Sequence, residues 1–183
     1  MSFVSLLADA ADELRRWSTE DPRQAQLRDV FLQHLATHHD GVWRTGAPAH
    51  LTASALILDP LRRAVLLVLH RKVGRWLQPG GHCEADDLAL GAAALREARE
   101  ESGIADLVLV PGILHVDRHP APCNPGVVEE HLDVRYMVLA PANAVATASE
   151  ESLDARWFEW DRLPDGIEPT IVAMLALGRD RLS

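Results

Sequence analysis

Three glutamates carry the clearest chemical potential in this 183-residue chain: Glu97, Glu100 and Glu101. Positions i, i+3 and i+4 share one face of a helix, so the three carboxylates would converge there. Like charges at this spacing repel each other, and Arg96 can offset only part of that repulsion. A hard divalent cation such as Mg²⁺ or Mn²⁺ is the natural partner, because it prefers oxygen ligands. The spacing therefore indicates a metal site, although a solvated helix face alone would show the same pattern.

A glycine-containing loop precedes this helix and strengthens the case for a site. The pair Gly80 and Gly81 follows Pro79, and His82 and Glu84 come directly after it. Glycines let the backbone approach a ligand closely and point carbonyl or amide groups at it. The loop and the glutamate face together predict a place for a metal ion and a diphosphate, with Gly80, Gly81, His82 and Glu84 as candidate substrate-binding residues.

The elements that must position these residues alternate along the chain. Apolar periodicity predicts helices and strands that mix throughout, which favours α/β or α+β layering over a helical bundle. Two buried apolar runs around Asp59-Pro60 predict a β-hairpin. The helices are expected over 3–17, 22–37, 89–102 and 167–182, the strands over 51–58, 63–70, 107–110, 113–116, 132–139 and 155–160, and loops over 37–50, 73–87 and 120–126.

Composition and charge exclude several classes of protein. The chain carries 18 Lys and Arg against 27 Asp and Glu, a net charge of -9, with 48% hydrophobic residues. An acidic chain is ill suited to binding nucleic acid through its phosphates, and residues 1–40 hold four arginines against seven acids, the wrong balance for a DNA-binding helix pair. A metal ion can still supply positive charge for a small anionic substrate.

The cellular setting is predicted from what the sequence lacks. The first 15 residues have no basic start and contain three acids, unlike a signal peptide. The longest apolar run, 171–177, is far below the roughly 18 residues of a membrane span. The two cysteines, Cys83 and Cys123, form no disulfide framework. We expect a soluble, cytoplasmic protein without membrane contact.

The segment from Gly81 to Ile104 resembles the Nudix box of the Nudix hydrolases, which are MutT-like. The matching residues are Gly81, Arg96, Glu97, Ala98, Glu100, Glu101, Gly103 and Ile104, preceded by a similar approach over 76–80. The resemblance implies a Nudix-type α/β/α sandwich with a mixed β-sheet over 46–183, and an N-terminal helical extension over 1–45. It also implies a metal-dependent hydrolase that cleaves a diphosphate bond in a nucleoside diphosphate linked to another moiety.

Residue roles follow from the resemblance position by position. Glu97, Glu100, Glu101 and the carbonyl of Gly81 would hold Mg²⁺ or Mn²⁺, and Arg96 would orient the glutamates. The general base would be Glu97 or a later acid, for which Glu129, Glu130, Glu150 and Glu151 are candidates. The chain departs from the box at its first acid: Asp87 stands where a glutamate is expected, and eight rather than seven residues then lead to Arg96.

Several alternatives stay open at this point. A nucleotide-sensing regulatory protein on the same fold would bind without turnover, and a Nudix-fold isomerase would need a catalytic cysteine, for which Cys123 is a poor candidate. The groups attached to the diphosphate of the substrate are not determined, and Pro120 favours ADP-ribose only slightly. The N-terminal helices would cap the pocket or form a homodimer. A group of residues on two neighbouring predicted strands indicates either a second metal site or substrate contacts: His115, Asp117, His119, His131 and Asp133.

The remaining side chains of interest are expected to pack rather than react. Trp76, Trp157 and Trp160 would fit a stacked base, but core and rim packing is the commoner role. Cys83 has no evident triad partner and is predicted to fill space as a small apolar residue.

Overall fold

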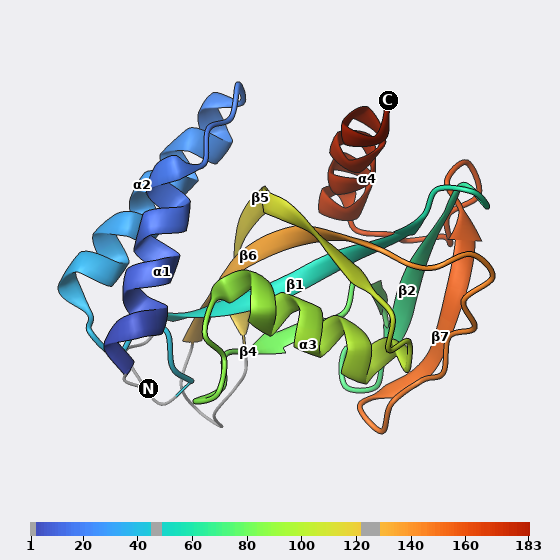
Figure 1. The fold of residues 1–183 in the computed structure, drawn as a ribbon, viewed down its shortest axis with the longest axis horizontal. Coiled ribbons are helices and arrows are strands. Elements are labelled where there is room, and N and C mark those ends of the chain that lie inside the picture. The colour runs from blue at the N-terminus through green and yellow to red at the C-terminus, as the bar shows by residue number, and fades with distance from the viewer. Residues whose placement is uncertain (1–2, 45–48, 122–128) are drawn as a thin grey trace.

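The computed structural model describes residues 3–44, 49–121 and 129–183. The described chain mixes helices and strands, as the periodicity predicted (Figure 1). The helices are α1 (Phe3–Arg16), α2 (Pro22–Thr37), α3 (Leu90–Ser102) and α4 (Pro169–Leu182). The strands are β1 (Ala49–Asp59), β2 (Ala64–His70), β3 (Trp76–Leu77), β4 (Gly80–His82), β5 (Val108–Ala121), β6 (Glu129–Leu139) and β7 (Ser152–Glu159).

The strands form one mixed, seven-stranded sheet with β1 near its centre. The main order is β3-β2-β1-β6-β5, while β4 pairs with β1 and β7 pairs with β2. Strands β1 and β6 run parallel, and β1 and β2 form the predicted antiparallel hairpin. Its turn is held by Asp59, whose carboxylate accepts the backbone N–H groups of Leu61 and Arg62 at 3.0 Å.

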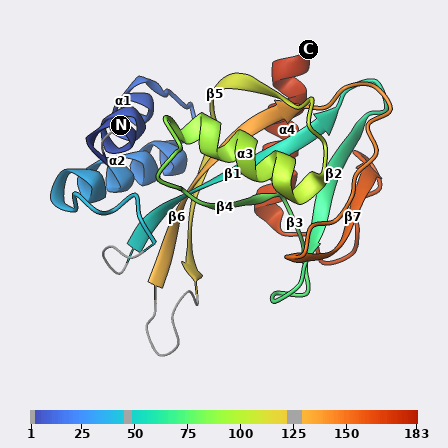
Figure 2. The ribbon, with the colours of Figure 1, turned by 60° about the horizontal axis from the view of Figure 1, so that its bottom comes forward.

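Helices cover both faces of this sheet, which confirms the predicted α/β/α sandwich (Figure 2). One face packs on α1, α2 and α3 through a core that includes Leu14, Phe31 and Val134. The other face packs on α4 through a core that includes Leu56 and Met174. The alternation of side chains along β1 explains the division, because neighbouring residues on a strand point to opposite faces.

The prediction of two strands separated at Pro111-Gly112 is wrong, because both parts belong to β5. The ladder to β6 shifts its register between Val110 and His115, so the intervening residues form a bulge inside one strand. Gly112 adopts a φ of 90°, which only glycine adopts without strain. The Pro-Gly pair thus bends the strand instead of ending it.

All three predicted loops also contain strand residues, since the loop over 37–50 includes the first two residues of β1. The loop over 73–87 includes β3 and β4, and β4 is held by pairing with Thr52, Ala53 and Ser54 of β1. The predicted loop over 120–126 begins too early, since Pro120 belongs to β5 and pairs with Glu130 of β6. Proline is tolerated there because β5 is at the edge of the sheet, where its missing N–H costs no ladder bond. Cys123 lies outside the described residues.

The N-terminal helices are joined to the rest of the chain by polar contacts as well as by the shared core. The Tyr136 hydroxyl of β6 donates to Glu13 of α1 at 2.7 Å. The backbone N–H of Leu90, the first residue of α3, donates to the Asp9 carboxylate of α1 at 3.0 Å. A carboxylate at a helix N-terminus satisfies a free N–H and complements the helix dipole. Thus a side chain of α1 caps the start of α3. The division of the chain into a helical extension over 1–45 and a domain over 46–183 stays a proposal.

Candidate active site

Helix α3 positions the box glutamates by burying its small residues. Gly91, Ala93, Ala94 and Ala98 are buried, so the helix lies close against the sheet. Gly103 ends it in the left-handed region at a φ of 69°. The predicted helix over 89–102 is thereby confirmed to within a residue, and its last turns carry the glutamates beside β4.

The structure brings two of the three carboxylates against the glycine pair. The N–H of Gly80 donates to Glu101 Oε1 at 3.0 Å. A Cβ atom on Gly81 would lie 2.7 Å from Glu97 Oε1, and one on Gly80 would overlap Ser54. Gly80 therefore has no room for a side chain beside β1, and a side chain on Gly81 would displace the Glu97 carboxylate. We call Gly80, Gly81, Glu97 and Glu101 the glycine corner.

Glu100 lies at the rim of this corner and not inside it. The side chain of Glu100 is 57% exposed, whereas that of Glu97 is 14% exposed. The guanidinium of Arg96 contacts both, donating to Glu97 Oε1 at 2.9 Å and to Glu100 Oε2 at 3.0 Å. Arg96 thus fixes the direction of two box carboxylates.

Arg96 is itself held by Asp87 and by the backbone of β4. Its guanidinium makes two bonds to the Asp87 carboxylate, at 3.1 and 2.9 Å, and a third to the carbonyl of His82 at 2.9 Å. Asp87 also accepts the N–H of Glu84 at 2.7 Å. The shorter acid and the longer spacer therefore still supply a partner for Arg96, while the Glu84 side chain stays exposed, 3.8 Å from Arg96.

Burial changes the acidity of the two corner carboxylates. It raises the pKa of Glu97 to about 7, against the opposing effect of Arg96. Burial also raises the pKa of Glu101 to about 7, although the Gly80 N–H favours the ionised form. The negative charges of neighbouring glutamates, including Glu151, act in the same direction as burial. The corner therefore lacks enough positive charge of its own to hold two ionised carboxylates.

A divalent cation would supply this missing positive charge. The donors in reach are carboxylate oxygens and the backbone of a glycine without a side chain, the ligand type that Mg²⁺ and Mn²⁺ prefer. The residues present therefore fit such an ion. The corner can hold a cation and, through it, an anionic group of a substrate.

The predicted histidine and aspartate group is divided by the structure. Asp133 and Asp117 bind Arg135, at 2.7 and 2.8 Å, so these carboxylates are engaged by a cation of the protein. His119 contacts Asp117 at 3.1 Å. Burial lowers the pKa of His115 to about 4, which keeps that imidazole neutral. Among the described residues, His115, Asp117, His119 and Asp133 are not part of a group that could hold a metal ion.

His131 instead belongs to a cluster that sequence reasoning missed. It lies with His50 and His82, and one ring nitrogen of each lies within 4.8 Å of the others. Burial, and then the neighbouring imidazoles, lower the pKa of His131 to about 3. The sequence predicts a loop at His50 and the substrate loop at His82, and only the strand register brings them together.

The tryptophans and Cys83 pack as predicted. Trp76 and Trp160 contact the core under α4, and Trp157 contacts the core under the end of α3. Cys83 belongs to the core under α1 and α2, and burial raises its pKa to about 12. A thiol with that pKa is a poor nucleophile.

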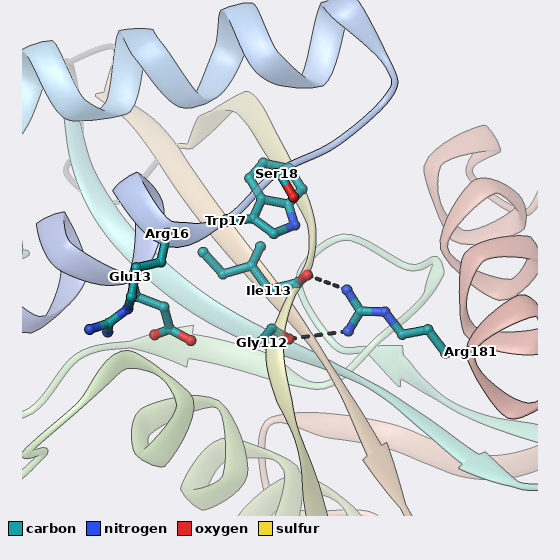
Figure 3. Close-up of a pocket in the computed structure, with 7 residues that line it drawn as sticks. All are labelled: Glu13, Arg16, Trp17, Ser18, Gly112, Ile113 and Arg181. Carbon is teal, nitrogen blue, oxygen red and sulfur yellow. Dashed lines mark hydrogen bonds between the residues drawn. The ribbon is translucent and has the colours of Figure 1, made fainter.

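A recess of about 440 Å³ lies elsewhere, between α1, the bulge of β5 and α4 (Figure 3). Arg181 crosses it and donates to the carbonyl of Gly112 at 3.2 Å, and also to that of Ile113. None of the glutamates of α3 lines it. The recess is therefore separate from the glutamate face, and Arg181 occupies part of it by binding the backbone of the β5 bulge.

Comparisons with known proteins identify the family to which this fold is similar. The family model described as NUDIX domain matches residues 48–177. A NUDIX family hydrolase from Clostridium perfringens is 25% identical, with 73% of this chain and 98% of that chain covered and a TM-score of 0.58. An Ap4A hydrolase from C. elegans is 18% identical over 72% of this chain and 96% of that chain, with a TM-score of 0.57. A UDP-X diphosphatase is 16% identical over 97% of this chain and 91% of that chain, with a TM-score of 0.54.

No curated protein matches the chain by sequence. The α/β/α sandwich defines the class of fold. The chain belongs to the Nudix family, since the family model spans most of its length. As a member it is an enzyme that hydrolyses diphosphate bonds, and family members typically use divalent metal ions. Their substrates are small nucleotide-diphosphate molecules.

Proposed function

We propose that the glycine corner is the catalytic centre and that it cleaves a nucleoside diphosphate linked to another moiety. Glu97, Glu100, Glu101 and the carbonyl of Gly81 would hold Mg²⁺ or Mn²⁺. The observation that carries this proposal is the buried Glu101 and the largely buried Glu97, with the pKa of each raised to about 7, placed against the Gly80 and Gly81 backbone.

The bound cation would neutralise diphosphate oxygens and lower the pKa of a water molecule. The chain's own residues orient the groups that would bind the metal ion and the diphosphate. Arg96 is a positioning residue, since its bonds go to Glu97, Glu100 and Asp87 and none is directed to a substrate. Gly80 and Gly81 would present backbone groups to the diphosphate, with His82 and Glu84 on the same segment.

We propose Glu97 as the general base, with Glu151 as its competitor. Glu151 is favoured among the later acids because its charge acts on both corner glutamates. Glu130 is paired with Arg118, and the side chain of Glu129 lies outside the described residues. The pH profile of turnover in Glu97→Gln and Glu151→Gln, measured at saturating Mg²⁺, distinguishes them, since only loss of the base then abolishes the limb on which turnover rises with pH.

The test of the site compares three variants of the same chemical change. Glu100→Gln and Glu101→Gln should lower Mg²⁺-dependent turnover by orders of magnitude. Glu20→Gln, on an exposed glutamate before α2, is the matched control and should keep wild-type turnover. Circular dichroism and thermal unfolding check that all three fold. Full activity in both α3 variants would show that this helix face is not the metal site.

Identification of the substrate requires an assay of several candidate compounds, because the glycine corner would recognise the diphosphate and not the groups at its ends. ADP-ribose, dinucleotides, dinucleoside polyphosphates, nucleoside triphosphates and UDP-linked compounds should be assayed with Mg²⁺ and with Mn²⁺, scoring release of phosphate or monophosphate. At least one should be turned over. Binding of a nucleotide with no turnover of any compound would favour the regulatory alternative.

The other expectations are part of this proposal. The acidic charge supports a protein that binds no nucleic acid, and the N-terminal helices support a homodimer or a cap over the pocket. In the ranges 3–44, 49–121 and 129–183, no helix has the length and apolarity that crossing a membrane requires. A cytoplasmic location and the absence of membrane contact remain predictions.

A further inference from the structure

A row of histidines crosses four neighbouring strands of the sheet. His50 of β1 pairs in register with His131 of β6, and His131 pairs with His119 of β5. On the other side of β1, His82 of β4 pairs with Thr52, two residues from His50 and on the same face. Residues 81 positions apart in the chain, such as His50 and His131, are thus set side by side by the strand register.

Three of these imidazoles face one another closely enough to share an ion. The ring centroids are 5.1 Å apart for His50 and His82, 5.0 Å for His50 and His131, and 5.1 Å for His82 and His131. One nitrogen from each ring lies within 4.8 Å of the other two. A tetrahedral zinc ion with Zn–N bonds of 2.0–2.1 Å needs nitrogens about 3.3 Å apart, which small side-chain rotations would reach.

We propose that His50, His82 and His131 form a binding site for a transition-metal ion of the zinc class. Three imidazoles suit Zn²⁺, whereas Mg²⁺ prefers oxygen donors. His50 is fully buried, and His82 and His131 are partly exposed, so an ion can enter from the side of the latter two. Three protein ligands leave a fourth coordination position for water.

The outer contacts of the cluster fit a metal site as well. His119 packs edge-on against His131, with ring centroids 5.4 Å apart, and its Nδ1 contacts Asp117. The rigid strands keep the ligand side chains near one another, because their backbones are fixed by the ladders of β1 with β4 and with β6. The ion would therefore join three strands at one point.

The position of His82 links this site to the glycine corner. Its side chain belongs to the cluster, while its carbonyl accepts a bond from Arg96. An ion on the three histidines would fix β4, and with it Gly80 and Gly81, against β1. The histidine site itself does not depend on the proposed catalytic role of the corner, since its donors are different residues.

The test measures zinc on the full chain after treatment with a chelator. Metal-free wild type, His82→Gln, His131→Gln, Glu101→Gln and the control His39→Gln, an exposed histidine, are titrated with Zn²⁺ in the presence of excess Mg²⁺. Zinc content after gel filtration and the visible spectrum of the Co²⁺-loaded protein give two readouts besides activity. Thermal unfolding of each metal-free variant checks the fold.

We expect one Zn²⁺ per chain in wild type, His39→Gln and Glu101→Gln, with a low-coordinate Co²⁺ spectrum. In His82→Gln and His131→Gln the affinity should fall more than roughly 100-fold, because loss of even an outer partner of a metal ligand costs 10–100-fold. The proposal is overturned if wild type binds no zinc or if both histidine variants bind as wild type does. It is also overturned if zinc is lost only in Glu101→Gln, which would assign the ion to the glycine corner.

Discussion

The raised pKa values of Glu97 and Glu101 predict that Mg²⁺ binding releases protons near neutral pH. Both pKa values are about 7 in the metal-free protein, and burial is the main cause. A carboxylate must be ionised to bind the cation, so the proton held by each glutamate has to leave. Lower pH therefore weakens Mg²⁺ binding, and higher pH strengthens it until both groups are ionised.

The size of the effect follows from the two pKa values. At pH 7 each glutamate is about half protonated, so binding releases about one proton in all. At pH 6 the release is about 1.8 protons, and at pH 8 it is about 0.2. The fraction with both groups ionised rises about 100-fold between pH 6 and pH 8, which corresponds to about 2.7 kcal/mol of binding free energy.

Isothermal titration calorimetry in two buffers of different ionisation enthalpy measures this release directly. Titrations of Mg²⁺ at pH 6, 7 and 8 give both the proton count and the affinity. Glu101→Gln should release about half as many protons at pH 7 as wild type, because one of two titrating groups is gone. Glu20→Gln should match wild type.

A proton count near zero at pH 7 would refute this reasoning, as would a Mg²⁺ affinity that is constant from pH 6 to pH 8. Either result would mean that the two carboxylates are already ionised without the cation. The corner would then be neutralised by the protein itself, and the argument for a required ion would fail.

Two further predictions concern the contacts that hold α3. Asp9→Ala removes the carboxylate that caps Leu90 and should lower the free energy of unfolding by about 0.5–2 kcal/mol. Urea denaturation measures this change. An unchanged midpoint of the urea transition would show that the cap does not stabilise the fold. Asp87→Asn weakens the paired bonds to Arg96 and should lower Mg²⁺ affinity roughly 10–100-fold, since Arg96 orients the ligand carboxylates. Calorimetry at pH 8 tests this, and wild-type affinity would show that Arg96 is held well enough without Asp87.

Local signals in the sequence accounted for the helices. Asp21 and Pro22 are residue types that favour a helix start, and α2 begins at Pro22 with an Asp21 side-chain cap. Gly103 marked the end of α3 because only its left-handed backbone closes the helix there. These signals operate within a few residues, so no knowledge of distant contacts was needed.

Elements whose state depends on distant partners were not predictable in the same way. The sequence Gly80-Gly81-His82 has no strand propensity, and it is a strand because β1 pairs with it. The helical spacing predicted that three glutamates share a face, but not that Glu101 is buried while Glu100 is exposed. That difference depends on where β4 lies against α3.

The contacts of α1 also determine when the protein can finish folding. Asp9 and Glu13 bind partners that lie 81 and 123 residues further along the chain. At a synthesis rate of about 5–20 residues per second, Tyr136 is made roughly 6–25 s after Glu13. During that interval the apolar stripe of α1, which includes Leu6 and Leu14, can pack on α2 but not yet on Val134 of β6. The docking of α1 on the rest of the fold therefore waits for segments that are made much later in the chain.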